Sequence, residues 1–201
     1  MYTPKGFHFE NESEKIAFMK TYSFATIITN KKGLPLATQL PFVIRESEQR
    51  LVLSSHFALA NEQASFIEHE VSLVIFSEPH AYISPSHYDK LESVPTWDYL
   101  SVHAYGKAEI VSSPIEKQQA IEEMIAFYEP EYFQQWGNLP QKFKDGMAKG
   151  TVVFNLLVSD LQGQKKISQN KNAKERERIV QQLETSESGP ARAIAEIIKK
   201  A

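Results

Sequence analysis

The 201-residue sequence contains no cysteine. This absence excludes disulfides, thiolate metal sites, cysteine-held iron–sulfur clusters and a cysteine nucleophile, and it suits a reducing compartment. The sequence also lacks any window that approaches the roughly 18 apolar residues of a membrane-spanning helix, and residues 1–15 have no apolar core of the kind found in signal peptides. We therefore expect a cytoplasmic protein with no membrane segment.

The sequence has no excess of positive charge, since its formal net charge at pH 7 is -3. Binding to nucleic acid depends largely on neutralising phosphates, so direct DNA binding is doubtful and is expected to be weak at most. One basic run does occur, over residues 165–178, but Glu175 and Glu177 interrupt it. That run could clamp an anion, or it could be a solvated surface.

Several motifs that carry chemistry are missing as well. We find no G-x-S-x-G, no P-loop and no G-x-G-x-x-G, so nucleophilic hydrolysis and Rossmann-type dinucleotide binding have no support. His80, His87 and His103 do not have the helical spacing of a zinc-binding pair. The sequence therefore predicts no metal site.

The pattern of apolar residues predicts short strands with helices between them. The expected strands cover residues 24–29, 36–44, 51–56, 71–76, 101–111 and 151–158, and the expected helices cover residues 12–21, 58–69, 114–128 and 190–200. Turns are expected at residues 30–33 and 45–50, a long ordered loop at 77–97, and a loop with one short helix at 129–150. This order predicts an α+β chain built around a small antiparallel barrel. We expect one domain over residues 1–185, followed by a C-terminal helix over residues 186–201.

Two segments of the chain could form a ligand site. Ser54, Ser55 and His56 end a predicted strand just before the helix that contains Asn61, and such a strand–helix junction can seat a phosphate, although Ser55 could simply cap the helix. The second segment, residues 79–99, is dense in aromatic, hydroxyl and imidazole side chains. It could line a pocket for a planar ligand, or its own Tyr and Trp rings could clamp it over one end of the barrel.

Three sequence motifs together resemble the PaiB family of FMN-binding negative transcriptional regulators. They are PHAYISPSHY (79–88), VPTWDYLSVHAYG (94–106) and KKISQNK (165–171), in the order and spacing of that family, and the resemblance extends from residue 1 to about residue 183. It implies an antiparallel split β-barrel of the flavin-reductase and pyridoxamine-phosphate-oxidase type, with peripheral helices. It also implies a homodimer that holds FMN at the subunit interface.

The resemblance further implies roles for individual residues. The phosphate and ribityl end of FMN would lie against Ser54, Ser55, His56 and Asn61. The isoalloxazine would be flanked by Thr96, Trp97 and Tyr99. The site would be closed by Lys166, Ser168, Gln169 and Asn170. The chain departs from the family at Asp98, where Asn is usual, and at Leu59 and Glu62, where a basic residue and Pro are common.

The function implied by the resemblance is regulatory. It is that of a dimeric flavin-binding sensor that represses genes for sporulation and extracellular protease production. The alternative is a flavin-dependent reductase or oxidase on the same barrel. Haem handling is a third interpretation, which would need an exposed ligand such as His80 or His103.

Overall fold

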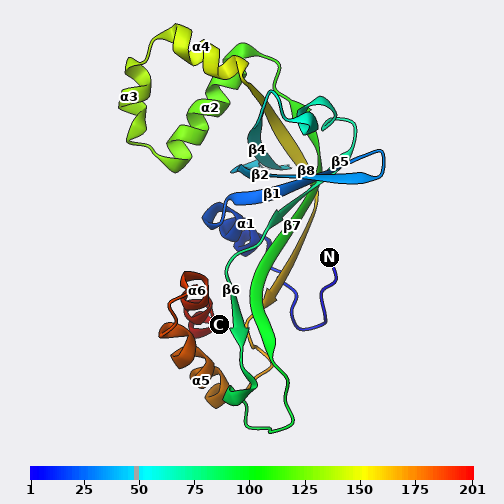
Figure 1. Cartoon of the computed structure of the whole chain (residues 1–201), viewed down its shortest axis with the longest axis vertical. Helices are drawn as coiled ribbons and strands as arrows, with labels where there is room; N and C mark the ends of the chain where they lie inside the picture. The colour runs from blue at the N-terminus through cyan, green and yellow to red at the C-terminus, as the bar shows by residue number, and fades with distance from the viewer. Residues whose placement is uncertain (48–49) are drawn as a thin grey trace. The chain divides into compact units, whose positions relative to one another are not determined.

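The computed structural model describes residues 1–47 and 50–201, and its contacts divide the chain into two compact units (Figure 1). Unit 1 comprises Met1–Lys15, Ser77–His103 and Gln162–Ala201. Unit 2 comprises Ile16–Phe76 and Ala104–Leu161. Each unit is thus assembled from segments that are distant in the sequence. Two long strands, β7 (Thr96–Ile110) and β8 (Thr151–Lys166), contribute residues to both.

Unit 2 contains most of an eight-stranded sheet. Its shorter strands are β1 (Phe24–Lys31), β2 (Leu34–Pro41), β3 (Val43–Ser47), β4 (Arg50–Ala58) and β5 (Val71–Phe76). The sheet order is β2-β1-β5-β7-β8-β4-β3, and the paired strands β1–β2, β1–β5, β3–β4 and β4–β8 are antiparallel. Lys32 and Gly33 join β1 to β2 with φ angles of 51° and 86°, the positive pair that a tight type I′ hairpin requires.

The core of unit 2 is built from aromatic rings on the strands and, at Phe42, on the link between β2 and β3. Phe42, Phe57, Phe76 and Phe154 are fully buried. The Phe57 and Phe154 rings stack with centroids 4.9 Å apart, and Phe42 meets Phe154 edge-on at 6.3 Å. Burial of rings of this size is the main stabilising contribution to such a unit.

Three helices of unit 2 follow β7 and precede β8 along the chain, as the colours of Figure 1 show. They are α2 (Pro114–Tyr128), α3 (Tyr132–Asn138) and α4 (Gln141–Lys149). Ser113 caps α2 by accepting from the Glu116 amide, and Pro114 occupies its first turn, where a missing N–H costs nothing. At the other end of α2, the Tyr128 hydroxyl donates to Ser23 Oγ at 2.7 Å and thereby links the helix to the segment just before β1.

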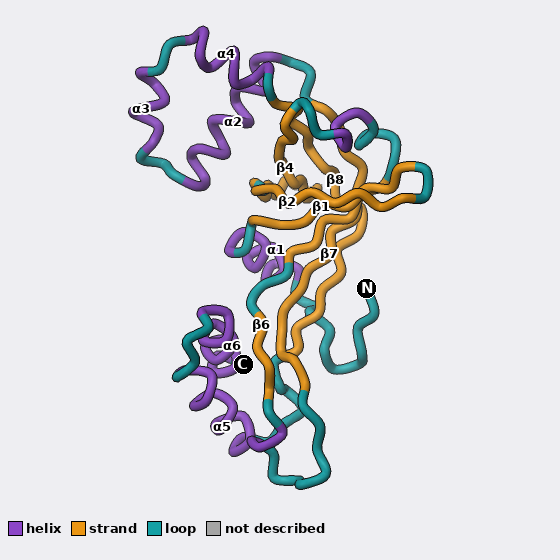
Figure 2. Tube along the Cα trace, in the orientation of Figure 1, coloured by secondary structure: helices purple, strands orange, loops and turns teal. Residues whose placement is uncertain are grey.

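Unit 1 contains the N-terminal arm, β6 (His80–Ile83), the first part of β7, the last part of β8, and helices α5 (Ala173–Glu184) and α6 (Gly189–Lys200). Strand β6 pairs antiparallel with β7, and α6 packs against both α5 and β6 (Figure 2). The arm follows β8, because Phe9 N–H donates to the Gly163 carbonyl at 3.1 Å and Lys165 N–H donates to the Phe7 carbonyl at 2.9 Å. Helix α1 (Glu12–Thr21) begins in unit 1 and ends in unit 2.

The structure confirms the α+β class and the antiparallel sheet with peripheral helices. The helices predicted at residues 12–21 and 114–128 and the strand predicted at 71–76 have the observed bounds. The predicted turn at residues 45–50 falls partly on residues 48–49, which lie outside the described part of the chain; on either side, β3 ends at Ser47 and β4 begins at Arg50. The expected domain boundary at residue 185 stays a prediction.

The helix predicted at residues 58–69 is wrong. Ala58 is the last residue of β4, and only one 3₁₀ turn forms, η1 (Glu62–Ser65). Asn61 caps this turn by accepting from the Gln63 amide at 2.9 Å. The Gln63 side chain is buried among strand groups and donates to the Leu36 carbonyl at 3.1 Å, so packing against the sheet overrides the helical spacing of the apolar residues.

Five other element predictions need correction. The loop predicted at residues 77–97 contains β6 and a 3₁₀ turn, η2 (Pro85–His87), and β7 begins at Thr96 rather than at residue 101. The predicted strand 36–44 is two strands, separated at Phe42, whose amide donates to the Ser23 carbonyl. Residues 129–150 contain two helices instead of one, and β8 continues to Lys166.

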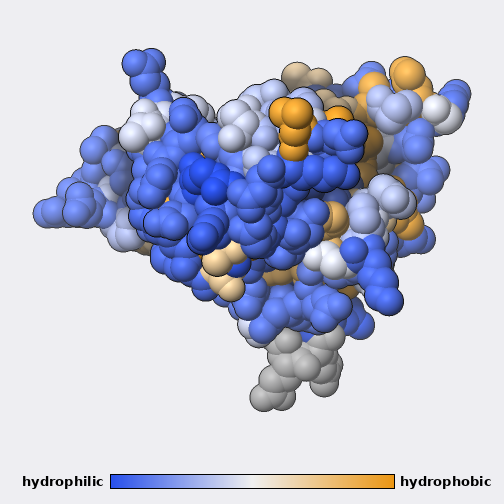
Figure 3. All heavy atoms as spheres, turned by 90° about the horizontal axis from the view of Figure 1, so that it is seen from below, coloured by the Kyte–Doolittle hydropathy of each residue, from blue (hydrophilic) through white to orange (hydrophobic). Residues whose placement is uncertain are grey.

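The face of the molecule in Figure 3 is mostly hydrophilic, with small separate apolar patches. Over the described residues, no helix is both long and apolar enough to cross a membrane.

Candidate functional site

The main candidate site is a pocket of about 440 Å³ within unit 1, here called the Asp98 pocket. It lies where the start of β7 meets the end of β8 and the loop before α5. Its lining residues are Phe7, Tyr88, Glu92, Ser93, Val94, Thr96, Asp98, Lys166, Ser168, Asn170 and Lys171. A volume of this size is in the range of small-molecule sites.

The period of a β-strand decides which residues of β7 reach this pocket. Thr96 and Asp98 are two positions apart and both line it, whereas Trp97 and Tyr99 alternate with them and face the other side of the strand. Thr96 Oγ1 accepts a hydrogen bond from Lys166 Nζ, which ties β7 to the end of β8 inside the pocket. Lys166 also lies over the Phe7 ring, 5.8 Å from its centroid.

The loop after β8 has an unusual backbone that positions a hydroxyl. Ser168 has φ 55°, the left-handed region that costs a non-glycine residue energy. The Gln169 side chain supports this turn, because it accepts from the Ile167 amide at 2.8 Å and donates to the Lys165 carbonyl at 2.6 Å. As a result Ser168 Oγ donates to Asp98 Oδ2 at 2.6 Å.

Two buried polar atoms of the Asp98 pocket have no hydrogen-bond partner among the described residues. They are Asp98 Oδ1 and the Tyr88 hydroxyl oxygen. Leaving such atoms unpaired costs free energy, so their presence indicates that the pocket receives a ligand or water that pairs with them. Asn170, which also lines the pocket, is exposed.

The charged residues that line the pocket are two lysines, Lys166 and Lys171, and two acids, Asp98 and Glu92. Burial raises the pKa of Asp98, although the Ser168 hydrogen bond and the positive charges of Lys166 and Lys171 oppose the shift. Burial, together with the neighbouring Asp98 charge, raises the pKa of Tyr88, so its phenol stays neutral. Lys171 Nζ lies 3.5 Å from the centroid of the Tyr88 ring. The pocket therefore offers positive charge and several donors, which suits an anionic group.

On the other side of β7, unit 1 has an aromatic groove of about 560 Å³. Trp97 forms its floor with His80 and Tyr82, at ring-centroid distances of 5.7 and 5.9 Å. Trp97 and Tyr82 are each 52% exposed. Tyr99 pairs with His80 in the strand register. Trp97 and Tyr99, expected beside the isoalloxazine, are thus separated by the hairpin from Thr96, Lys166, Ser168 and Asn170.

The remaining predicted residues belong to unit 2. Ser54 and Ser55 are buried, and Ser55 Oγ donates to the Pro41 carbonyl at 2.6 Å instead of capping a helix. Asn61 Nδ2 donates to Thr38 Oγ1 at 3.0 Å while its Oδ1 caps η1. These polar groups serve the sheet and the turn. That they hold the FMN phosphate stays a prediction, and so does their convergence with the residues of unit 1.

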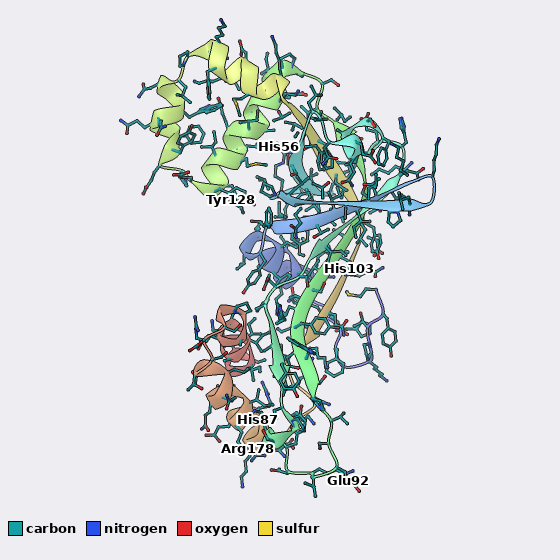
Figure 4. All side chains as sticks on the ribbon, in the orientation of Figure 1. His56, His87, Glu92, His103, Tyr128 and Arg178 are labelled. Carbon is teal, nitrogen blue, oxygen red and sulfur yellow. The ribbon has the colours of Figure 1, made fainter. Side chains whose placement is uncertain are left out.

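His56 lines a mainly apolar pocket of about 410 Å³ in unit 2. Met124, Tyr128 and Phe143 line that pocket with it, and Figure 4 labels His56 and Tyr128. Burial lowers the pKa of His56, so at pH 7 the imidazole is neutral and adds no charge for a phosphate.

Sequence reasoning did not assign Phe7, Tyr88 and Lys171 to the site. Tyr88 and Lys171 lie inside the quoted motifs PHAYISPSHY and KKISQNK, which could have indicated them, whereas Phe7 comes from the N-terminal arm and carried no signal. Figure 4 labels His87, Glu92 and Arg178, which lie in the same region as the loop that bears Tyr88. Arg178 Nε donates to the His87 carbonyl at 2.8 Å and its guanidinium pairs with Asp89 at 2.6 Å, which fixes α5 to the loop that bears Tyr88. Within residues 1–47 and 50–201, no group of three or more His, Asp or Glu side chains could hold a metal ion.

Comparison with known proteins decides the family. Residues 1–160 match the family model described as "Putative FMN-binding domain". The protease synthase and sporulation protein PAI 2 of Bacillus subtilis is 38% identical over 205 residues, covering 99% of this chain and 97% of that protein. The chain belongs to this FMN-binding PaiB family. FMN is accordingly the cofactor of the family, and the charge and donor set of the Asp98 pocket fit its phosphate.

Solved structures with the same fold confirm the split-barrel prediction for the PaiB-family chain. The flavocytochrome Anf3 of Azotobacter vinelandii superposes with a TM-score of 0.64 at 17% identity, covering 80% of this chain and 69% of Anf3. A FAD and heme binding protein of Mycobacterium smegmatis has a TM-score of 0.64 at 12% identity, covering 79% of this chain and 73% of that protein. At these identities the likeness concerns the fold alone.

Proposed function

We propose that this chain is a dimeric, FMN-binding regulator of transcription, and that its Asp98 pocket holds the flavin phosphate. The family supports flavin binding, and the name of the Bacillus subtilis relative supports a role in sporulation and protease production. One observation carries the placement of the phosphate: the same pocket is lined by two lysines, by the Ser168 hydroxyl and by two residues whose buried polar atoms have no partner within residues 1–47 and 50–201. A phosphate has the negative charge to pair with the lysines and the oxygen atoms to accept from the Tyr88 hydroxyl, and it pairs with Asp98 Oδ1 only when that carboxyl is protonated.

The residues of the pocket would bind the cofactor through different kinds of interaction. Lys166 and Lys171 supply positive charge, and Ser168 and Asn170 supply polar groups at the turn between β8 and α5. The Phe7 and Tyr88 rings offer apolar faces beside these cations. When bound, the flavin would provide a redox-active group, which is the property a sensor needs.

A preference for FMN over riboflavin tests this proposal directly, because the two flavins differ only in the phosphate. Charge-assisted hydrogen bonds contribute about 1.5–3 kcal/mol each, so we expect FMN to bind at least about tenfold more tightly. Quenching of flavin fluorescence during titration with the purified protein measures both dissociation constants. Equal affinity for the two flavins would contradict a phosphate site in this chain.

The proposed regulation is indirect, because the basic run over residues 165–178 is occupied within unit 1. Lys165 pairs with Glu14 at 3.4 Å, and Arg178 pairs with Asp89. Arg176 donates to the Ile198 carbonyl at 2.7 Å, while Lys166 and Lys171 face the Asp98 pocket. Few of these cations are left for a nucleic-acid backbone, and the net charge of the chain is negative.

The proposed dimer is supported by large apolar side chains on the helices of unit 2. Ile115 is 71% exposed, and Phe133, Phe143 and Met147 are between 40% and 51% exposed. Exposed apolar side chains of this size are typical of interfaces. We expect light scattering at micromolar concentration to report a dimer and Ile115→Glu to weaken it, because the substitution puts a charge on that surface. Leu91→Glu, at a 98% exposed loop residue of unit 1, is the matched control and should leave the dimer intact; a monomeric wild type would contradict the proposal.

A further inference from the structure

The environment of Asp98 gives this residue a role beyond lining the pocket. Its side chain is fully buried at the base of the pocket, with Oδ2 held by Ser168 Oγ at 2.6 Å and Oδ1 unpartnered among the described residues. The strained Ser168 backbone is maintained by the Gln169 side chain and by the Lys171 amide, which donates to the Ser168 carbonyl at 3.0 Å. The strained loop therefore holds one carboxyl oxygen buried beside the pocket, without a partner among the described residues.

The groups that face Asp98 come from every element around the pocket. Lys166 of β8 and Lys171 of the following loop bring positive charge, and Ser168 donates a hydrogen bond. Tyr88, after η2, adds a neutral phenol. Glu92, on the exposed loop before β7, is the other acid that lines the pocket, while Glu175 lies nearer to Tyr88 and accepts from the Asp89 amide at 2.9 Å.

An ionised Asp98 would oppose the binding of a phosphate. Two negative groups that share a pocket repel each other, and a phosphate at Lys166 and Lys171 would occupy the cations that favour the ionised carboxyl. A protonated Asp98 removes the repulsion, and its Oδ1 then carries a proton that can be donated to a phosphate oxygen. Ser168 can keep its hydrogen bond to Oδ2 in both states, so the protonation needs no rearrangement of the loop.

We propose that Asp98 is a specificity-determining residue that takes up one proton from solvent when the pocket receives a phosphate monoester, and donates it from Oδ1 to a phosphate oxygen. This proposal rests on the proposed function, in which FMN supplies that phosphate. The proton moves from water or buffer to the carboxyl, and no covalent bond of the ligand changes. The pocket thereby selects a phosphate by a donor that exists only in the protonated protein.

The affinity for FMN should fall as the pH rises. Above the pKa of Asp98 in the free protein, binding must add a proton, so the dissociation constant rises by up to tenfold for each unit of pH. The second ionisation of a phosphate monoester lies near pH 6, so between about pH 7 and 9 the charge of FMN itself stays constant. A loss of FMN affinity between about pH 7 and 9 that disappears in Asp98→Asn is therefore due to the ionisation of Asp98.

Calorimetric titration of the full chain with FMN tests the proposal. Experiments at pH 7.0 and 8.5, each in buffers of different ionisation enthalpy, give the affinity and the number of protons taken up. For the wild type we expect uptake approaching one proton and binding up to about thirtyfold weaker at the higher pH, which is the tenfold-per-unit limit applied to this interval. Asp98→Asn carries a permanent amide donor and no charge, so it should bind without proton uptake and more tightly than the wild type at pH 8.5.

Glu92→Gln is the matched control, because it removes the other acidic charge of the same pocket and should keep the proton uptake of the wild type. Wild-type binding without proton uptake and with the same affinity at both pH values would overturn the role of Asp98 while leaving the flavin site in place. A folded Asp98→Asn protein that no longer binds FMN would overturn it too. Failure of the wild type to bind FMN at either pH would overturn the proposed function and this proposal together.

Discussion

Lys166→Ala should weaken FMN binding by about ten- to a hundredfold and leave riboflavin binding nearly unchanged. Lys166 is the cation that joins the two strands of the Asp98 pocket, through its hydrogen bond to Thr96 Oγ1. A lost hydrogen bond between an ammonium and a phosphate costs about 1.5–3 kcal/mol, and each 1.4 kcal/mol is a factor of ten in affinity. Riboflavin has no phosphate, so the same substitution removes only a minor contact from it.

The neighbouring lysine is the control for this prediction. Lys165 lies over the Phe9 ring at 5.4 Å much as Lys166 lies over the Phe7 ring at 5.8 Å, but it pairs with Glu14 and does not line the pocket. Lys165→Ala removes the same charge from the preceding residue of β8. It should leave the affinities for FMN and riboflavin within about twofold of the wild type. The account fails if both flavins weaken equally in Lys166→Ala, or if Lys165→Ala behaves in the same way.

Gly106→Ala should lower the stability of the protein by about 3 kcal/mol or more, the upper end of the usual cost of overpacking. A Cβ at Gly106 would lie 2.2 Å from the Leu157 carbonyl oxygen and 2.8 Å from Leu156 Cδ2. The first contact is with the backbone of β8, which cannot move aside without separating the two strands. At roughly 2–4 °C per kcal/mol for a chain of this size, the melting temperature should fall by about 6–12 °C.

The control for Gly106→Ala is the same substitution at Gly137 in α3, where a Cβ meets nothing within 4 Å. Alanine there should raise stability by about 0.5–1 kcal/mol, because glycine is a poor helix former. Thermal unfolding followed by circular dichroism measures both variants. An unchanged melting temperature in Gly106→Ala would mean that β7 and β8 are less closely paired than the structure shows.

How far the sequence predicts the fold depends on how local its signal is. The helix at 114–128 carries its own cap at Ser113 and Pro114, so its bounds could be predicted from the sequence. The predicted helix at 58–69 failed because buried Gln63 is held by Leu36, a residue of a distant strand. Contacts of that kind leave no trace in the spacing of apolar residues.

The candidate site shows the same dependence. With the strand predicted to begin at residue 101, Thr96 and Trp97 fell in a loop where neighbouring side chains could face one ligand. Because β7 begins at Thr96, its alternation directs Thr96 to the Asp98 pocket and Trp97 to the aromatic groove. The basic segment KKISQNK (165–171) could be recognised from the sequence alone. The support of the Ser168 backbone by Gln169 and the contribution of Phe7 to the pocket could not.

The most direct test of the account is the position of the flavin phosphate in a crystal structure of the protein grown with FMN. We expect electron density for the phosphate inside the Asp98 pocket, within hydrogen-bonding distance of Lys166 Nζ and Asp98 Oδ1 and next to Ser168. Asp98 Oδ1 and the Tyr88 hydroxyl, the two buried polar atoms without a partner in the described part of the chain, should then face ligand or ordered water. Phosphate density beside Ser54, His56 and Asn61 of unit 2, with no ligand in the Asp98 pocket, would contradict the account.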